Sequence, residues 1–175
     1  MSARRGCGLA VSVFDRIGAR VLWCRWDVLQ RLMDLSIEIA REGREGRRIG
    51  TLFTLGEADL VLARSRPLIL DPLAGHAPAR TSIFDENLRG TVKELAQLDG
   101  AFVVDADGTV RSACRYLDVA VEDVGLRLGL GSRHLAAASV SKQIRMTRLG
   151  HQRHSLFLFH SVGNFTMPIW PAGRF

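Results

Sequence analysis

A short turn between two apolar segments sets the strongest limit on the fold of this 175-residue chain. Residues 101–104 (AFVV) and 109–114 (TVRSAC) are rich in the residue types of buried strands. The intervening Asp107-Gly108 is typical of a tight β-hairpin, because both residues tolerate the backbone conformations that such turns require. The two strands are therefore expected to run antiparallel, and a strict alternation of strands and helices is excluded.

Helical and strand-like patterns surround this hairpin. Apolar residues recur at helical spacing from Asp27, and Gly43 and Gly46 are expected to close this helix. The spacing recurs after Asp85, which is expected to cap its helix. The pattern also predicts a buried strand over 49–55, a short helix over 57–65 that Pro67 stops, a loop over 71–78, a helix opening at 129–132 and a closing hairpin over 156–170. We therefore expect an α/β fold with one mixed β-sheet flanked by helices over residues 27–175, after an irregular N-terminal extension over 1–26.

The composition fits a globular domain of this length. With 47% hydrophobic and 24% charged residues, the chain resembles neither disordered nor repetitive proteins. Its three cysteines are scattered without a CxxC pair, which argues against a disulfide scaffold or a zinc site and favours a reducing cytoplasm. Residues 155–173 are uncharged but include two prolines and a histidine, so buried strands and turns are expected there, and no membrane span.

Charge is distributed unevenly along the sequence. Residues 1–48 carry a net charge of +4 and residues 49–123 a net charge of −5, whereas residues 124–175 carry seven basic residues and no acidic one. This basic C-terminal third is suited to phosphate groups, either of a nucleotide or of a nucleic acid. An arginine-rich composition explains the same excess, since 22 of the 24 basic residues are arginine, so charge alone does not identify a partner.

The tripeptide Asp99-Gly100-Ala101 is the first candidate site. It lies between the end of a predicted helix and an apolar strand, so its carboxylate is expected at the end of the sheet. A carboxylate there can hold Mg²⁺ or Mn²⁺ together with substrate phosphates, and glycine allows another group to approach the backbone closely. The same three residues also fit an ordinary Asp-Gly turn.

A glycine-rich turn followed by an alanine-rich helix is the second candidate site. The sequence GLGSRHLAAA over residues 129–138 would present unpaired N–H groups and the positive end of the helix dipole to an anion. Ser132 can donate to a phosphate oxygen, Arg133 can bind phosphate through two hydrogen bonds, and His134 can donate or relay a proton. The alternative is an ordinary helix cap with a solvated arginine.

In these two blocks the sequence resembles the diadenylate cyclase domain family, in particular its free-standing members. Family members share an Asp-Gly-Ala, here Asp99-Gly100-Ala101, and later a Gly-Ser/Thr-Arg-His, here Gly131-Ser132-Arg133-His134, followed by small residues. Residues 39–46, 49–56, 95–98 and 112–117 add further matches, so the likeness runs from residue 29 to Lys142. Two separate blocks in the right order make this resemblance specific.

The resemblance implies an enzyme, a nucleotidyltransferase that condenses two ATP into cyclic di-AMP and two pyrophosphates across a homodimer or larger homo-oligomer. It implies that Asp99 is a ligand of Mg²⁺ or Mn²⁺ and activates the 3′-hydroxyl, with Arg133 and His134 as further catalytic residues. The implied ATP-binding residues are Gly100, Ala101, Tyr116, Leu117, Gly131, Ser132, Arg133, His134 and Ser161. The implied partners are ATP and a second copy of the chain in the cytoplasm, and neither a membrane nor a nucleic acid is expected.

The C-terminal part departs from the family pattern. Family members continue with a Val-Ser-Glu segment whose glutamate joins the metal site, whereas alignment on Ser161 and Thr166 places Val162 at that position. No carboxylate follows Asp123 in the sequence, so no nearby shift of the alignment restores one. The alternative function is therefore a catalytically impaired module that binds ATP or cyclic di-AMP, and a basic nucleic-acid-binding protein ranks third.

Overall fold

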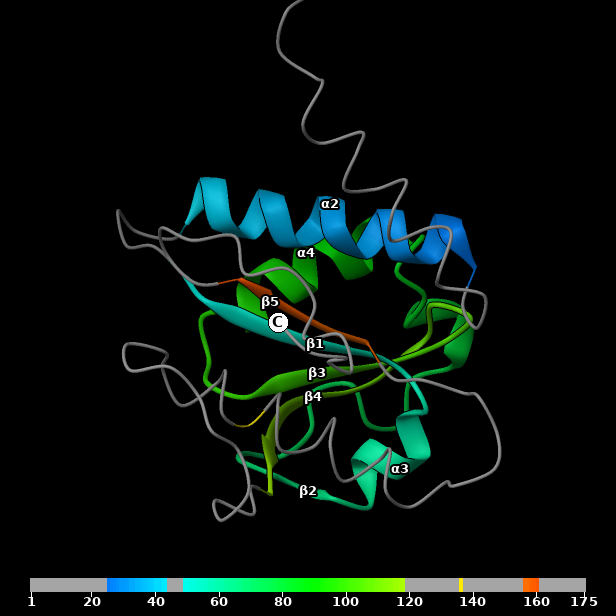
Figure 1. The fold of residues 1–175 in the computed structure, drawn as a ribbon, viewed down its shortest axis with the longest axis vertical. Coiled ribbons are helices and arrows are strands. Elements are labelled where there is room, and N and C mark those ends of the chain that lie inside the picture. The colour runs from blue at the N-terminus through cyan, green and yellow to red at the C-terminus, as the bar shows by residue number, and fades with distance from the viewer. Residues whose placement is uncertain (1–24, 44–48, 119–135, 137–155, 161–175) are drawn as a thin grey trace, which may run out of the picture.

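The structure, a computed structural model, describes residues 25–43, 49–118, 136 and 156–160, the last segment by its backbone alone (Figure 1). The described strands form one five-stranded mixed sheet in the order β2-β4-β3-β1-β5. Strands β1 and β3 are parallel, and the other neighbouring pairs are antiparallel. The strands are β1 (Thr51–Gly56), β2 (Ser65–Pro67), β3 (Ala101–Asp105), β4 (Val110–Leu117) and β5 (Leu156–His160).

Helices cover both faces of this sheet (Figure 1). The long helix α2 (Trp26–Glu42) and helix α4 (Glu86–Leu95) lie over one face, and the short helix α3 (Ala58–Leu62) packs on the other. A 3₁₀ turn, η1 (Pro78–Arg80), lies in the connection between β2 and α4. Among the residues that the structure describes, no helix is both long and apolar enough to cross a membrane.

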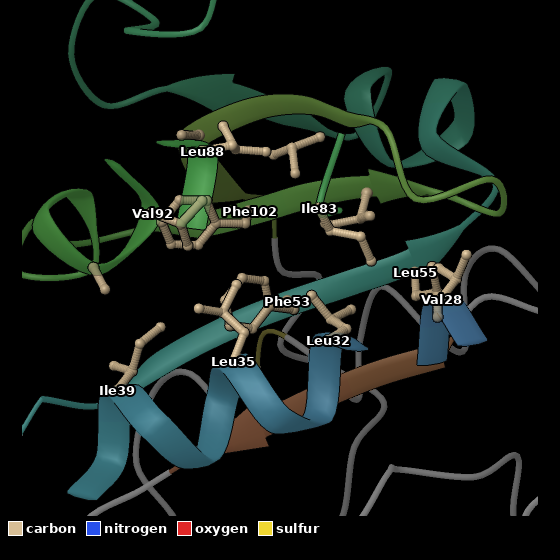
Figure 2. Close-up of a cluster of buried hydrophobic side chains, with 14 of the residues drawn as sticks. Val28, Leu32, Leu35, Ile39, Phe53, Leu55, Ile83, Leu88, Val92 and Phe102 are labelled. Atoms are coloured by element: carbon tan, nitrogen blue, oxygen red, sulfur yellow. The ribbon is translucent and has the colours of Figure 1, made fainter. Parts of the chain in front are cut away.

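The larger core cluster fills the space between α2, α4 and the sheet (Figure 2). Phe53 and Phe102 stack there with their ring centroids 5.0 Å apart. These two residues are paired in register on the parallel strands β1 and β3, so their side chains point to the same face of the sheet. The helices contribute Val28, Leu29, Leu32, Leu35 and Ile39 from α2 and Leu88 and Val92 from α4.

A second core cluster lies on the opposite face of the sheet. Its buried members are Leu52, Ala58, Val61, Ala101, Val103 and Leu117. Leu52 pairs with Ala101 one position before the Phe53–Phe102 pair, and side chains alternate along a strand, so this cluster faces away from α2. Ala136 has helical backbone geometry and packs against this cluster from the C-terminal part of the chain.

Most described elements lie close to their predicted bounds, and the α/β class with a mixed sheet between helices is confirmed. The helix predicted from Asp27 begins one residue earlier, and Gly43 ends it with a φ of 56°. Asp85 caps α4 as predicted, because its carboxylate accepts from two N–H groups of the first turn. The first half of the predicted closing hairpin is β5; the second half lies outside the described residues, as does the predicted helix except for Ala136.

The sequence does not predict the edge strand β2. The pattern predicts one helix over 57–65, but α3 ends at Leu62 and residues Ser65–Pro67 pair with the end of β4 instead. Pro67 is compatible with this place because an edge strand leaves alternate N–H groups without a neighbouring strand. Three residues are too few for a recognisable pattern, so only the distant pairing with β4 makes them a strand.

Candidate nucleotide-binding site

One end of the sheet gathers those predicted site residues that the structure describes. Strand β3 begins immediately after Asp99 and Gly100, and its parallel neighbour β1 begins at the same end. The antiparallel strands β4 and β5 finish there, as their registers with β3 and β1 require. Asp99 and Gly100 therefore lie at the same end of the sheet as Tyr116 and Leu117, which close β4.

Asp99 is exposed at this end of the sheet, and its Oδ1 accepts a hydrogen bond of 2.9 Å from the Gly100 N–H. An exposed oxygen ligand suits Mg²⁺ or Mn²⁺ held jointly with substrate phosphates, because such ions keep several waters and need one or two carboxylates. Among the described residues, no group of three or more His, Cys, Asp or Glu side chains is arranged to hold a metal.

Gly100 is required by its neighbour across the sheet. Its φ of 109° lies in the region that favours glycine. A Cβ at this position would lie 2.7 Å from the Cys114 carbonyl carbon and 2.8 Å from the Arg115 backbone nitrogen, closer than real Cβ atoms approach other atoms. The Asp-Gly-Ala turn thus rests directly on the backbone of β4, and contact of Gly100 with a nucleotide remains a prediction.

Tyr116 and Leu117 point to opposite faces of β4, as neighbouring residues of a strand do. Leu117 is 3% exposed and belongs to the second core cluster together with Ala101. Tyr116 is 44% exposed, and the Arg66 guanidinium lies 4.5 Å from the centroid of its ring. Of the two side chains, that of Tyr116 is accessible to a base; that both residues border an adenine remains a prediction.

The second candidate block is linked to this region through Ala136. The predicted residues that lie outside the described part of the chain are Gly131, Ser132, Arg133, His134 and Ser161. Ala136, two residues beyond His134, packs against the cluster that contains Ala101 and Leu117. Ala136 therefore lies on the same face of the sheet as the Ala101 side chain.

The side chain of Arg115, near the end of β4, forms hydrogen bonds that stabilise the fold. Its guanidinium donates to Ser65 Oγ at 3.1 Å, to the Ser65 carbonyl oxygen at 2.6 Å and to the Leu62 carbonyl oxygen at 3.2 Å. These bonds tie β4 to the turn between α3 and β2. Arg115 is therefore a structural residue, and phosphate binding by Arg133 remains a prediction.

Asp71 contacts β4 in this region, although no motif in the sequence marks it. Its Oδ1 accepts from the N–H groups of Leu73 at 3.0 Å and Ala113 at 3.4 Å, and its Oδ2 accepts from the Ser112 hydroxyl at 2.5 Å. Burial raises the pKa of the nearby Cys114 thiol, and the Asp71 carboxylate raises it further. The local sequence indicates only a loop here, since Ser112 is 41 residues away along the chain.

Comparison with known proteins identifies the relatives of this domain. Residues 38–149 match the model of the DAC family, described as "DisA bacterial checkpoint controller nucleotide-binding". A diadenylate cyclase from Methanocaldococcus jannaschii is 52% identical over 114 residues, which are 65% of this chain and 36% of that protein. A diadenylate cyclase from Haloferax volcanii is 33% identical over 122 residues, which are 70% of this chain and 44% of that protein.

The chain thus aligns with less than half the length of each of these relatives. A crystal structure described as a hypothetical membrane spanning protein from Bacillus cereus is 17% identical, with a TM-score of 0.43 over 75% of this chain and 52% of that one. A likeness of that size carries no argument about this chain. The family match is decisive because it covers most of the sequence and includes both candidate blocks, Asp99–Ala101 and Gly131–His134. The chain belongs to the DAC nucleotide-binding family.

Proposed function

We propose that this chain is the catalytic domain of a diadenylate cyclase, which condenses two ATP into cyclic di-AMP and releases two pyrophosphates. The two relatives described above bear that name, and the family match contains both candidate blocks. The observation that carries the proposal is the packing of Ala136 against the cluster of Ala101 and Leu117. This packing supports a common site for Asp99 and the Arg133-His134 pair.

The proposed reaction consists of two displacements at phosphorus. In each, the 3′-hydroxyl oxygen of one ATP bonds to the α-phosphorus of the other, the bond from that phosphorus to the bridging oxygen breaks, and pyrophosphate leaves. The hydroxyl proton passes to a base. The first displacement gives a linear dinucleotide and the second closes the ring, so catalysis rests on positioning and on stabilising charge at phosphate oxygens.

Each proposed residue has one task in this scheme. Asp99 accepts the proton of the 3′-hydroxyl and is a ligand of Mg²⁺ or Mn²⁺; the ion, when bound, supplies charge neutralisation on the phosphates. Ser132 and Arg133 hold phosphate oxygens, and His134 donates a hydrogen bond to the triphosphate. Gly100, Ala101, Tyr116, Leu117, Gly131 and Ser161 are proposed to complete the ATP site.

Two subunits are needed in this scheme, because one subunit binds one ATP and supplies one of the two attacking hydroxyls. A two-fold axis would place the two nucleotides opposite each other, with each 3′-hydroxyl near the other α-phosphorus. We therefore propose a homodimer or a larger assembly of such pairs as the active form.

A product assay tests the proposal directly. The purified chain is incubated with ATP and Mn²⁺, and products are identified by mass spectrometry beside those of Asp99→Asn. We expect cyclic di-AMP and pyrophosphate from the native chain, and a loss of about a hundredfold or more in Asp99→Asn with ATP binding retained. Absence of cyclic di-AMP from a native chain that binds ATP would contradict the proposed activity.

A second candidate is a binding module without turnover, which Val162 and the lack of any carboxylate after Asp123 favour. The substitution Val162→Glu separates the two, because it supplies the carboxylate that the family pattern places there. A gain of turnover would identify an impaired cyclase. Nucleotide binding without product in both the native chain and Val162→Glu would identify the binding module.

A further inference from the structure

The hydrogen bonds of Asp71 converge on an irregular part of β4. Between the pairs Val104–Val110 and Ala101–Arg115, β4 advances five residues while β3 advances three, so β4 carries two additional residues there. Ser112 and Ala113, which donate to the Asp71 carboxylate, belong to this stretch. Asp71 thus binds the part of β4 in which the regular pairing with β3 is interrupted.

The same stretch contains a strained backbone conformation. Cys114 has a φ of 54°, and among the described residues it is the one non-glycine residue with a positive φ. Such a conformation persists only where surrounding contacts fix it. Contacts of this kind are the Asp71 bonds to its neighbours and the bond from the Leu68 N–H to the Cys114 carbonyl oxygen, 2.9 Å long.

The backbone of Cys114 lies directly against Gly100. The position that a Gly100 Cβ would take is 2.7 Å from the Cys114 carbonyl carbon and 2.9 Å from its Cα. The two backbones are therefore packed so closely that no Cβ fits between them. A shift of β4 at Cys114 therefore moves Gly100, and with it the neighbouring Asp99.

We propose that Asp71 is a positioning residue for Asp99, acting through Ser112, the Cys114 backbone and Gly100. This inference rests on the proposed function for its catalytic consequence. Its physical basis is that a displacement of about 1 Å in a reacting group costs on the order of a hundredfold in rate. The Asp71 carboxylate touches neither the nucleotide nor the metal in this scheme.

Asp71→Ala and Asp71→Asn test the inference together. Alanine removes all three hydrogen bonds, whereas the asparagine oxygen still accepts from Leu73 and Ala113 and its amide can donate to the Ser112 hydroxyl. We expect Asp71→Ala to lower kcat at least about tenfold and to raise the Mn²⁺ concentration for half activity, with KM for ATP changed less than about twofold. Asp71→Asn should restore most of kcat.

Asp107→Ala is the matched control. Asp107 accepts from the Thr109 N–H at 2.8 Å, so it also supports a turn by a carboxylate-to-backbone bond, but at the opposite end of β3 and β4. Hydrogen exchange of the amides at residues 100–103 gives a readout that needs no activity. We expect exchange there to be at least about tenfold faster in Asp71→Ala and unchanged in Asp107→Ala.

The outcomes distinguish this inference from the proposed function. A native chain without product contradicts the cyclase proposal, and hydrogen exchange then decides alone whether Asp71 holds the Asp99 turn. The inference is overturned if folded Asp71→Ala exchanges its amides at residues 100–103 as slowly as the native chain. It is also overturned if the kcat of Asp71→Ala equals that of Asp107→Ala. If Asp71→Ala does not fold, Ser112→Ala removes only the Oδ2 bond, and unchanged exchange in that variant overturns it equally.

Discussion

Substitution by alanine is expected to have opposite effects on the free energy of unfolding at Gly100 and at Gly90. A methyl group at Gly100 would strike the β4 backbone at 2.7 Å, at a φ of 109° that disfavours any other residue, whereas a methyl group at Gly90 in α4 meets no atom within 4 Å. We expect Gly100→Ala to lower the free energy of unfolding by about 2 kcal/mol or more. Gly90→Ala should raise it by roughly 0.4–1 kcal/mol, because alanine favours the helix.

Urea denaturation of both variants measures these changes. Equal effects of the two substitutions would contradict the close contact between Gly100 and Cys114. A glycine beside Asp99 can be required by the fold or by close approach of a ligand. The contact with β4 requires glycine there for the fold alone, before any ligand is bound. At the residue scale, the sequence predicts that another group approaches the backbone of Gly100 closely. It does not predict that this group is the backbone of β4.

The contact between helices α2 and α4 is fixed by charge as well as by apolar packing. Glu38 of α2 forms ion pairs with Arg89, whose side chain is 10% exposed, and with Lys93 Nζ at 3.0 Å. Burial acts to raise the pKa of Glu38, but hydrogen bonds from Lys93 and Arg89 outweigh it and hold the pKa below its ordinary value. The ionised form of Glu38 therefore stabilises the folded protein.

Glu38→Gln is expected to lower the free energy of unfolding at pH 7 by about 0.5–1 kcal/mol, a value that allows for the partial exposure of Glu38. Because the folded pKa is depressed, this stabilisation is present above the ordinary pKa of 4.5 and is lost as the pH falls through the folded value. The difference between native chain and variant should therefore shrink below pH 4.5, measured by urea denaturation from pH 7 to pH 3.

Glu42→Gln on the same helix is the control. Glu42 also binds Lys93 at 3.0 Å, but its side chain is 57% exposed, so the substitution should cost less than about 0.5 kcal/mol. A larger loss in Glu42→Gln than in Glu38→Gln, or a Glu38 effect that does not depend on pH, would contradict this account of the α2–α4 contact.

At the scale of elements, the sequence predicts what local periodicity encodes. The apolar face of α2, the Asp85 cap and the hairpin at Asp107-Gly108 each depend on a few neighbouring residues, and each is found. What it does not predict depends on distant partners: the strand β2, the two additional residues of β4, and the bonds of Asp71 to a strand forty residues later. For the candidate site, the position of Asp99 at a strand start is therefore predictable, whereas the support beneath it is not.

At the scale of the whole molecule, the proposed reaction needs two competent subunits for each cyclic product. In the proposed scheme, one subunit carries one Asp99 and activates one 3′-hydroxyl, so ring closure would need the Asp99 of a second subunit. When the native chain is mixed with Asp99→Asn, this requirement makes the rate of cyclic di-AMP formation depend on the fraction of native chain in the mixture. A mixed pair can complete one displacement only, and it should release the linear dinucleotide.

We expect cyclic di-AMP formation at fixed total protein to follow the square of the native fraction, because two-fold pairs form at random after subunit exchange. An equal mixture should then retain about one quarter of the native rate, and mass spectrometry should detect the linear dinucleotide that the native chain alone does not accumulate. Mixing with Glu42→Gln, which leaves the proposed site intact, should leave the rate unchanged. A rate that falls only to about one half, with no linear product, would show that each subunit completes the ring alone and would contradict the paired-subunit scheme.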